Sequence, residues 1–226
     1  MTVTLNLNGP GRKNIHSKQR MNRTLELFSG TKSFSKLVDG ETVTVDILDK
    51  FNPTHQADIL TWDYRIYPPG HFGIIWCSPP CTEYSKAKTR GIRNLEQADA
   101  CVRRCFEIID YFQPRVWILE NVGTGLLVNR METIRPNLHS TFADYCAYGK
   151  PYRKRTIFWS NIPLECSLCR GAGVCPNMDG TKHRGSVGNG TQRYNAAGIK
   201  SVWEKDAIPE ALIDSLLEQI DAAIIA

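Results

Sequence analysis

Short apolar segments alternate with amphipathic stretches along this chain, and this alternation restricts the fold more than any other feature. Residues 95–112 repeat apolar side chains at helical spacing, which predicts an amphipathic helix. Helical patterns also occur at residues 34–37 and 208–225. Apolar and β-branched runs predict strands at residues 24–28, 42–47, 73–77, 116–119 and 155–159. Strands that alternate with helices favour an α/β fold with a mostly parallel, doubly wound sheet.

The length of 226 residues suits one main α/β domain with a full core. No apolar run approaches the roughly 18 residues that a membrane span requires. Residues 1–23 have no apolar core that would act as a secretory signal. We therefore expect a soluble, intracellular protein whose eight cysteines stay reduced and serve packing, metal binding or catalysis.

Charge is distributed unevenly along the chain, although the formal net charge is only +5. Residues 1–23 carry five basic and no acidic side chains, and residues 150–205 carry ten basic against three acidic ones. From residue 206 onward the only charged side chains are five carboxylates. Such segregation suits a polyanionic partner such as nucleic acid. On charge alone, a solvated basic face is an equally good interpretation.

Three reactive side chains, those of Asp46, Cys81 and Glu120, lie at the ends of predicted strands. Two prolines precede Cys81, and because they cannot continue a central strand, the chain must leave the sheet there. Open α/β sheets bind ligands at the carboxyl ends of their strands. The turn after the first predicted strand contains a single glycine, Gly30, and lacks the three-glycine dinucleotide fingerprint. This pattern favours a nucleoside ligand without a pyrophosphate.

The order of these features resembles that of the DNA cytosine carbon-5 methyltransferases, especially the compact enzymes of phages and large viruses. Six segments carry the resemblance in the family's order: LELFSGT, VDILDKFNPT, QADILTWD, SPPC, ILENV and YGKPYRKRTIFWSN. They span residues 24–161, and the helix predicted at residues 208–225 resembles the final motif weakly. The resemblance implies a Rossmann-like, S-adenosylmethionine-dependent methyltransferase fold. For a phage or viral protein it also implies a location in the host cytoplasm or nucleoid.

The resemblance also implies a mechanism. Cys81 would add as a thiolate to ring carbon 6 of cytosine, and Glu120 would donate or share a proton at N3. An arginine of the later motif braces the ring carbonyl or the glutamate, a role for Arg153 or Arg155. In this sequence the motif is one residue shorter than usual, so both arginines remain candidates. The target base would have to be flipped out of a DNA duplex.

For the cofactor, the resemblance assigns Asp46 to the ribose hydroxyls, Asp58 to the adenine amino group and Phe28 to the adenine face. The turn at residues 29–33 and Ser78 would hold the methionine end. Lys32 replaces a glycine of the family pattern and is able to pair with the methionine carboxylate. The complete set implied for S-adenosylmethionine is Phe28, Ser29, Gly30, Thr31, Ser33, Asp46, Ile47, Asp58, Ile59, Ser78 and Pro79.

Four segments are expected along the chain. Residues 1–23 form a basic arm, residues 24–161 the catalytic domain, residues 162–205 a small target-recognition segment, and residues 206–226 a helix that packs on the catalytic domain. A recognition segment this short predicts a short target sequence or help from another subunit. The side chains expected to contact double-stranded DNA are Lys86, Lys88, Arg90, Arg93, Lys182, Arg184 and Arg193.

The recognition segment contains a candidate zinc site. Its possible ligands are Cys166, Cys169, Cys175 and His183, in a stretch rich in glycine, asparagine and lysine. A zinc ion would organise residues that are too polar to build a core of their own. Only the spacing between Cys166 and Cys169 is that of a metal knuckle, so packing of Cys166 is the alternative.

Three other functions remain open. Amino-group methyltransferases place Ser-Pro-Pro-aromatic at this strand end, whereas this chain has Cys81 there and Tyr84 three residues later. An RNA substrate, such as tRNA, would leave the chemistry unchanged. A catalytically silent nucleic-acid-binding protein would not need Cys81 and Glu120. Binding of S-adenosylmethionine and activity on DNA and RNA distinguish these alternatives.

Overall fold

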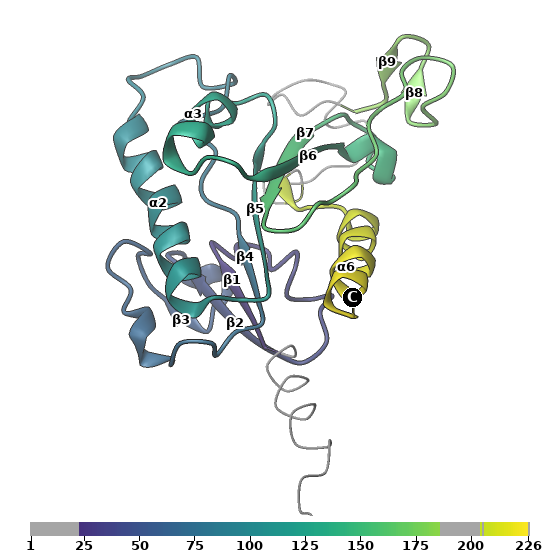
Figure 1. The fold of residues 1–226 in the computed structure, drawn as a ribbon. Helices are drawn as coiled ribbons and strands as arrows, with labels where there is room; N and C mark the ends of the chain where they lie inside the picture. The colour runs from purple at the N-terminus through teal and green to yellow at the C-terminus, as the bar shows by residue number, and fades with distance from the viewer. Residues whose placement is uncertain (1–22, 186–203, 205, 226) are drawn as a thin grey trace, which may run out of the picture.

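The sheet has seven strands in the order β3-β2-β1-β4-β5-β7-β6 (Figure 1). The computed structural model describes residues 23–185, 204 and 206–225. Neighbouring strands pair in parallel except β7, which is antiparallel to both β5 and β6. The strands are β1 (Arg23–Leu27), β2 (Glu41–Asp46), β3 (His55–Gln56), β4 (Ile74–Cys77), β5 (Val116–Val122), β6 (His139–Asp144) and β7 (Arg155–Ser160). The predicted α/β fold with a mostly parallel sheet is confirmed.

Helices cover both faces of the sheet, with α2 on one side and α6 on the other (Figure 1). Along β4, Ile75 and Cys77 belong to the core cluster that includes α2, whereas Ile74 and Trp76 belong to the cluster that includes α6. Successive strand side chains point to opposite faces, so a strand covered on both faces is a continuous apolar run. The helices are α2 (Leu95–Phe112), α3 (Leu127–Ile134) and α6 (Glu210–Ile225), with 3-10 turns η1 (Asp49–Phe51), η2 (Tyr64–Ile66) and η3 (Tyr145–Tyr148).

The structure differs from the sequence predictions in several places. Residues 34–37 form turns instead of a helix, because the backbone N–H groups of Phe34 and Ser35 donate to the buried carboxylate of Glu26. Strand β5 continues to Val122, since its antiparallel pairing with β7 extends to that residue. Strand β6 was not expected, because its sequence HSTFAD has little apolar alternation. Helix α3 was also missed.

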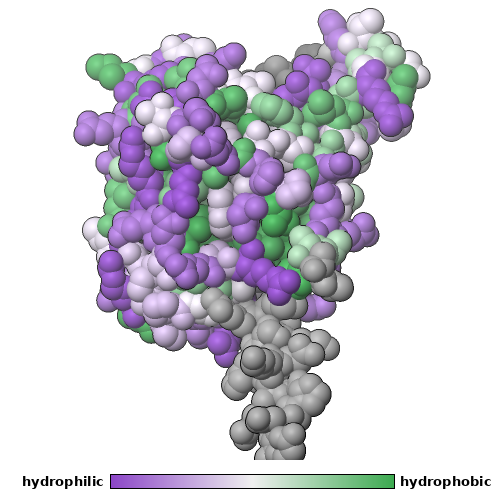
Figure 2. Space-filling view, viewed as in Figure 1, coloured by the Kyte–Doolittle hydropathy of each residue, from purple (hydrophilic) through white to green (hydrophobic). Residues whose placement is uncertain are grey.

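A two-stranded hairpin of β8 (Met178–Asp179) and β9 (Lys182–His183) projects from the body, at the upper right of Figure 1. On the face that Figure 2 shows, hydrophilic residues cover most of the surface over α2, and hydrophobic residues emerge between them in small groups. Within the described ranges, no helix combines the length and the apolar character that crossing a membrane requires.

Candidate active site

A cavity of about 310 Å³ opens where the chain order of the sheet reverses, between β1 and β4. This is the position at which doubly wound sheets bind ligands. Its lining comes from the loops that follow β1, β2 and β4, from β5, and from the residues before α6. Among the residues expected to bind the cofactor, those that line it are Phe28, Ser29, Gly30, Thr31, Ser33, Asp46, Ile47, Ser78 and Pro79.

The turn after β1 holds its backbone close to the cavity. Phe28 and Lys32 both have φ of 58°, a left-handed conformation that is uncommon for residues other than glycine, and Gly30 has φ of 44°. Backbone outliers of this kind persist where the surrounding structure fixes them, often at ligand sites. Lys32 donates to the carbonyl of Asn52 (2.6 Å), so its ammonium group is engaged outside the role suggested for it from the sequence.

Asp46 fixes this turn to the end of β2. Its Oδ2 accepts the N–H of Gly30 (2.7 Å), and its Oδ1 accepts the N–H of Leu48 (2.8 Å). Beside it, the hydroxyl of Ser29 is buried in the cavity wall and has no hydrogen-bond partner within the part of the chain that the structure describes. A buried polar atom of this kind requires a partner, and a ligand with polar groups supplies one. The lining therefore fits a nucleoside cofactor such as S-adenosylmethionine.

Two of the expected cofactor residues lie outside the cavity lining. Ile59 is 4% exposed and belongs to the core cluster on the α2 side. The carboxylate of Asp58 accepts the N–H of Leu60 (3.0 Å) and is exposed. By contrast, Leu48 and Phe51 line the cavity and were not expected, although both lie within the recognised segment VDILDKFNPT.

The nucleophile candidate, Cys81, lies on the cavity wall directly after the two prolines. The side-chain amide of Asn121 donates to the carbonyl of Pro79 (2.9 Å), which attaches this loop to β5. Burial raises the pKa of the Cys81 thiol, the nearby charge of Lys154 lowers it, and Glu120 raises it further. In the ligand-free protein the sulfur is therefore held as a thiol.

Glu120 faces the same cavity from β5. Its Oε1 accepts a hydrogen bond from the hydroxyl of Thr156 on β7. Burial raises the pKa of the Glu120 carboxyl, while the charge of Lys154 and the Thr156 hydrogen bond lower it less strongly. The protonated acid, which is the form able to donate a proton, is thus favoured.

Neither expected arginine reaches the cavity. Arg155 donates from Nε and Nη2 to the carboxylate of Asp144 (3.0 and 2.7 Å), which is fully buried. Arg153 is exposed and is not part of the lining. Lys154 lies there instead, because strand side chains alternate: Lys154 shares a face with Thr156, which contacts Glu120, and the two arginines point the other way.

Lys154 is a buried cation. Its side chain is 14% exposed, its Nζ lies 3.2 Å from Oδ1 of Asp206, and it stands 5.2 Å from the ring centroid of Tyr145. Burial alone would lower the pKa of Lys154, but Tyr145, Glu120 and Asp206 together outweigh it, so the pKa is raised. Cys81, Glu120 and a permanently charged lysine thus share one cavity. No sequence signal singled out the lysine, because the choice among residues 153–155 depends on how β7 pairs with β5.

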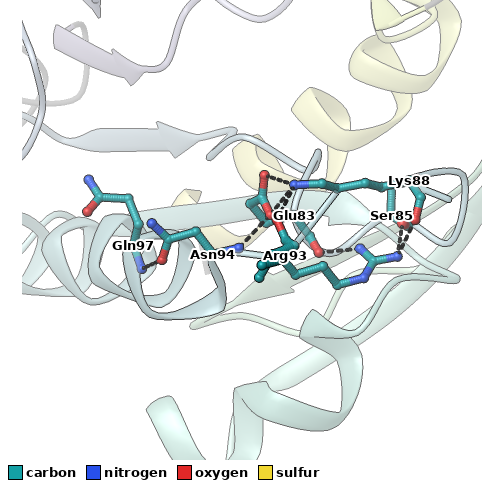
Figure 3. Close-up of polar contacts among 7 residues, drawn as sticks. Glu83, Ser85, Lys88, Arg93, Asn94 and Gln97 are labelled. Atoms are coloured by element: carbon teal, nitrogen blue, oxygen red, sulfur yellow. Dashed lines mark hydrogen bonds and ion pairs between the residues drawn. The ribbon is translucent and has the colours of Figure 1, made fainter. Parts of the chain in front are cut away.

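The loop after Cys81 is braced from within (Figure 3). Nζ of Lys88 contacts both carboxylate oxygens of Glu83 (2.5 and 2.6 Å), and Glu83 also accepts the N–H of Asn94. Arg93 donates to three loop carbonyls, those of Glu83, Ser85 and Lys88. The expectation that Lys88 and Arg93 clamp phosphates is thus replaced by an internal role. Their donors already have partners.

Other side chains of this loop and of the hairpin remain exposed. Lys86 and Arg90 face solvent, and Ile92, beside Arg93, is 96% exposed. On the hairpin, Lys182 and Arg184 are exposed as well. Arg193 lies outside the described residues. Tyr84 is fully buried, with its hydroxyl donating to Asp99 (2.9 Å), so it is not the aromatic wall that amino-group chemistry would need.

A second cluster lies next to β6. The ligand atoms of Cys146, Cys169, Cys175 and His183 all lie within 4.8 Å of one another. The expected ligand Cys166 is not in this set; it packs against the core cluster on the α6 side. Cys146 was missed because it follows β6, a strand that the sequence did not predict. None of the eight cysteines, all of which lie in the described residues, forms a disulfide.

The sheet order, with β7 antiparallel, and the cavity at its reversal agree with the S-adenosylmethionine-dependent methyltransferase fold that the sequence resemblance implies. The profile of the C-5 cytosine-specific DNA methylases matches residues 41–149. The chain is also 37% identical, over 176 residues, to the "Probable DNA (cytosine-5)-methyltransferase" of Frog virus 3 (isolate Goorha). This match covers 70% of this chain and 79% of the viral protein. The protein therefore belongs to the C-5 cytosine-specific DNA methylase family.

Solved structures resemble this chain more distantly. The Entamoeba histolytica methyltransferase EhMeth matches with a TM-score of 0.48 and 14% identity, over 65% of this chain and 56% of that structure. A DNMT2 from Spodoptera frugiperda matches with a TM-score of 0.46 and 17% identity, over 72% of this chain and 58% of that structure. This chain thus spans little more than half the length of either.

Proposed function

We propose that this protein transfers a methyl group from S-adenosylmethionine to carbon 5 of cytosine in DNA, with Cys81 as the nucleophile. The observation that carries the proposal is that Cys81, Glu120 and Lys154 line the same cavity as the turn after β1. A thiol, a proton donor and a cation are the groups that covalent activation of cytosine needs. Family membership supports the same reaction.

In this proposal, the Cys81 thiolate forms a bond to ring carbon 6, and the electrons of the C5–C6 double bond move towards C5 and the ring. Glu120 gives its proton to N3, which neutralises the charge that addition pushes onto the ring. S-adenosylmethionine, when bound, supplies the electrophilic methyl group that carbon 5 takes. A solvent water molecule then takes the C5 proton, the C5–C6 double bond re-forms as the bond from C6 to the Cys81 sulfur breaks, and N3 returns its proton to Glu120, so that thiolate and acid are both regenerated.

We assign the cationic role to Lys154. It lowers the pKa of Cys81 and lies on the strand face that carries Thr156, the partner of Glu120. A buried ammonium group stabilises developing negative charge more strongly than an exposed one, because the surroundings screen it less. Lys154 thus stabilises both the thiolate before addition and the ring oxygen during it, in place of the arginine that the resemblance implied.

The turn after β1 and Asp46 are proposed to hold the cofactor. Asp46 lies at the end of the second strand, where a carboxylate accepts hydrogen bonds from a ribose diol. The unpartnered hydroxyl of Ser29 supports a polar ligand group at the base of the cavity. Asp58 is proposed to contribute less than Asp46, since it does not line the cavity.

For DNA we propose that the braced loop after Cys81 presents Lys86 and Arg90 to phosphates and Ile92 to the base stack. Apolar side chains inserted between bases are a common device for opening a duplex. Internal bonds from Lys88 and Arg93 hold the loop in shape, with Ile92 exposed on the loop that follows the nucleophile. The hairpin residues Lys182 and Arg184 offer further phosphate contacts.

We further propose a structural zinc ion as a second cofactor, with Cys146, Cys169, Cys175 and His183 as ligands. Three thiolates and one imidazole form a closed tetrahedral set of the type that zinc prefers at structural sites. The separation of the four donor atoms is that of groups around a single ion. The site replaces the ligand set expected from the sequence, with Cys146 in the place of Cys166.

Incubation with S-adenosylmethionine and duplex DNA that contains 5-fluorocytosine tests the proposed reaction, because fluorine blocks the elimination step and traps the adduct. We expect a denaturation-resistant complex that maps to Cys81 and is lost in Cys81→Ala. Cys166→Ser is the matched control and should retain the complex. A complex that persists in Cys81→Ala contradicts the assignment of Cys81 as the nucleophile. A complex that forms with RNA containing 5-fluorocytosine, but not with the DNA, contradicts DNA as the substrate.

A further inference from the structure

We infer that a metal ion in the cluster of Cys146, Cys169, Cys175 and His183 positions Lys154, so that the ion acts on catalysis without touching the substrate. The inference rests on the proposed function, in which Lys154 is the catalytic cation and the cluster holds zinc. It goes further by connecting the two sites. The connection runs through Asp144 and Tyr145 on one side and Arg155 and Lys154 on the other, which are joined by one register pair and one backbone hydrogen bond.

The first link is Asp144, the last residue of β6. Its fully buried carboxylate accepts both donors of Arg155, the residue after Lys154, and its Oδ2 also accepts the backbone N–H of Cys169 (3.0 Å). Asp144 and Arg155 are register partners in the sheet. One carboxylate thus joins a metal ligand to the strand that carries the catalytic cation.

The second link is Tyr145, which lies between Asp144 and the metal ligand Cys146 in sequence. Its N–H donates to the carbonyl of Lys154 (3.1 Å), and its ring lies next to the Lys154 ammonium group, at 5.2 Å. A cation beside an aromatic face is stabilised by the ring. Because Cys146 is the next residue, an ion that fixes its sulfur also fixes the ring against which Lys154 rests.

The segment that supplies the other ligands has little core of its own. Its strands β8 and β9 have two residues each, and between Leu164 and the end of the described segment the only buried apolar side chain is that of Cys175. Sγ of Cys169 accepts the N–H of Gly171 (3.4 Å) and lies 3.4 Å from Nε2 of His183, contacts that orient the donors without bonding them covalently. Metal binding is what holds such segments in one conformation.

All four ligands come from the protein, so the ion has no open position for water or substrate and serves a structural purpose. Loss of the metal ion should therefore affect Lys154 only by changing where its side chain lies. The measurable consequence is at Cys81, because Lys154 favours its thiolate. Without the ion, the rate of Cys81 alkylation should depend on pH as if Lys154 were removed.

The first part of the experiment measures zinc in the full-length protein and in two serine variants. We expect one zinc ion per chain in the wild type and in Cys166→Ser, and none in Cys175→Ser. The variants are matched, since each removes one thiol from the same segment. A wild-type protein without zinc overturns the proposed zinc site, and this inference with it. Circular dichroism and S-adenosylmethionine affinity report whether Cys175→Ser still folds.

The second part measures alkylation of Cys81 against pH, by mass spectrometry of its peptide, in Cys175→Ser, Lys154→Met and the double variant. We expect both single variants to shift the profile to higher pH, and the double variant to shift it no further than Lys154→Met, because the two changes act through one group. A zinc-free, folded Cys175→Ser with the wild-type profile overturns the inference alone. If Cys175→Ser does not fold, zinc removed from the wild type by a chelator, and then restored, provides the same comparison.

Discussion

The two halves of the sheet contribute to the site in different ways. The half from β3 to β4 forms the cofactor side from parallel strands, of which β1, β2 and β4 lead directly into residues at the cavity, such as Asp46. The half from β5 to β6 depends on antiparallel pairing, and its cation, Lys154, is fixed by contacts with Asp144 and Tyr145 through neighbouring residues. In the first half, the cavity residues directly follow their own strands in the sequence. In the second half, the position of Lys154 depends on contacts between segments that are distant in the sequence. Substitutions in the first half should therefore affect the affinity for S-adenosylmethionine, and substitutions in the second half should affect the rate of methylation.

Glu120→Gln tests the catalytic half and should have the largest effect. Loss of the proton donor should lower kcat about 10²–10⁴-fold. S-adenosylmethionine affinity, measured by titration calorimetry, should change little. Because burial raises the pKa of Glu120, its donor form is present at low pH and is lost as pH rises through that pKa. The high-pH fall in adduct formation should therefore disappear in the variant, and its persistence contradicts the role.

Lys154→Met and Lys154→Arg test the role of the lysine charge in the same, catalytic half of the sheet. The methionine variant should lower kcat roughly 10²–10³-fold, as loss of one preorganised electrostatic group does. Since Lys154 lowers the pKa of Cys81, its removal should move the rising limb of the pH profile to higher pH. The arginine variant should retain part of the rate. Equal loss in both variants would show that size, and not charge, matters at this position.

Asp46→Ala tests the cofactor half. It removes the acceptor for a ribose and for the Gly30 N–H, so the dissociation constant of S-adenosylmethionine should rise about tenfold or more. The rate at saturating cofactor should change much less. Asp58→Ala is the comparison, because its carboxylate is exposed outside the cavity, and it should weaken binding less. The reverse order of the two effects would restore the assignment implied by family resemblance.

Ile92→Ala should have the smallest effect and one that depends on the substrate. Burial of an isoleucine side chain contributes about 1.5–3 kcal/mol. Because alanine retains part of the contact, methylation of paired DNA should slow by less than about tenfold, since 1.4 kcal/mol is about tenfold. A mismatched target cytosine costs less to flip and should rescue the variant. Ile66→Ala, another exposed isoleucine, is the control. Equal loss on paired and mismatched DNA rules out the role in base flipping.

The sequence predicted much of the fold because its elements are local. Helix α2 begins and ends where its apolar spacing indicates, and the parallel strands follow their β-branched runs. The strand-end positions of Cys81 and Glu120 on one cavity were likewise expected from the motif order. These features depend on neighbours a few residues apart, which a single sequence displays.

The remaining parts of the site depend on pairing between distant segments. Strand β6 is polar and lies at the sheet edge, so its pattern gave no signal, and with it Cys146 and Asp144 were missed. To identify Lys154, and not Arg153 or Arg155, as the residue at the cavity required the register of β7, which the sequence alone did not provide. Assigning phosphate contacts to Lys88 failed for the same reason, since Glu83 competes for its charge.

The ion pair between Lys154 and Asp206 affects how well Cys81 resists oxidation when no substrate is bound. The carboxylate of Asp206 offsets part of the lysine's charge, and it raises the pKa of Cys81 a little further, behind burial and Glu120. Oxidants attack thiolates much faster than thiols. Before DNA binds, the sulfur is therefore kept in the form that peroxide damages slowly.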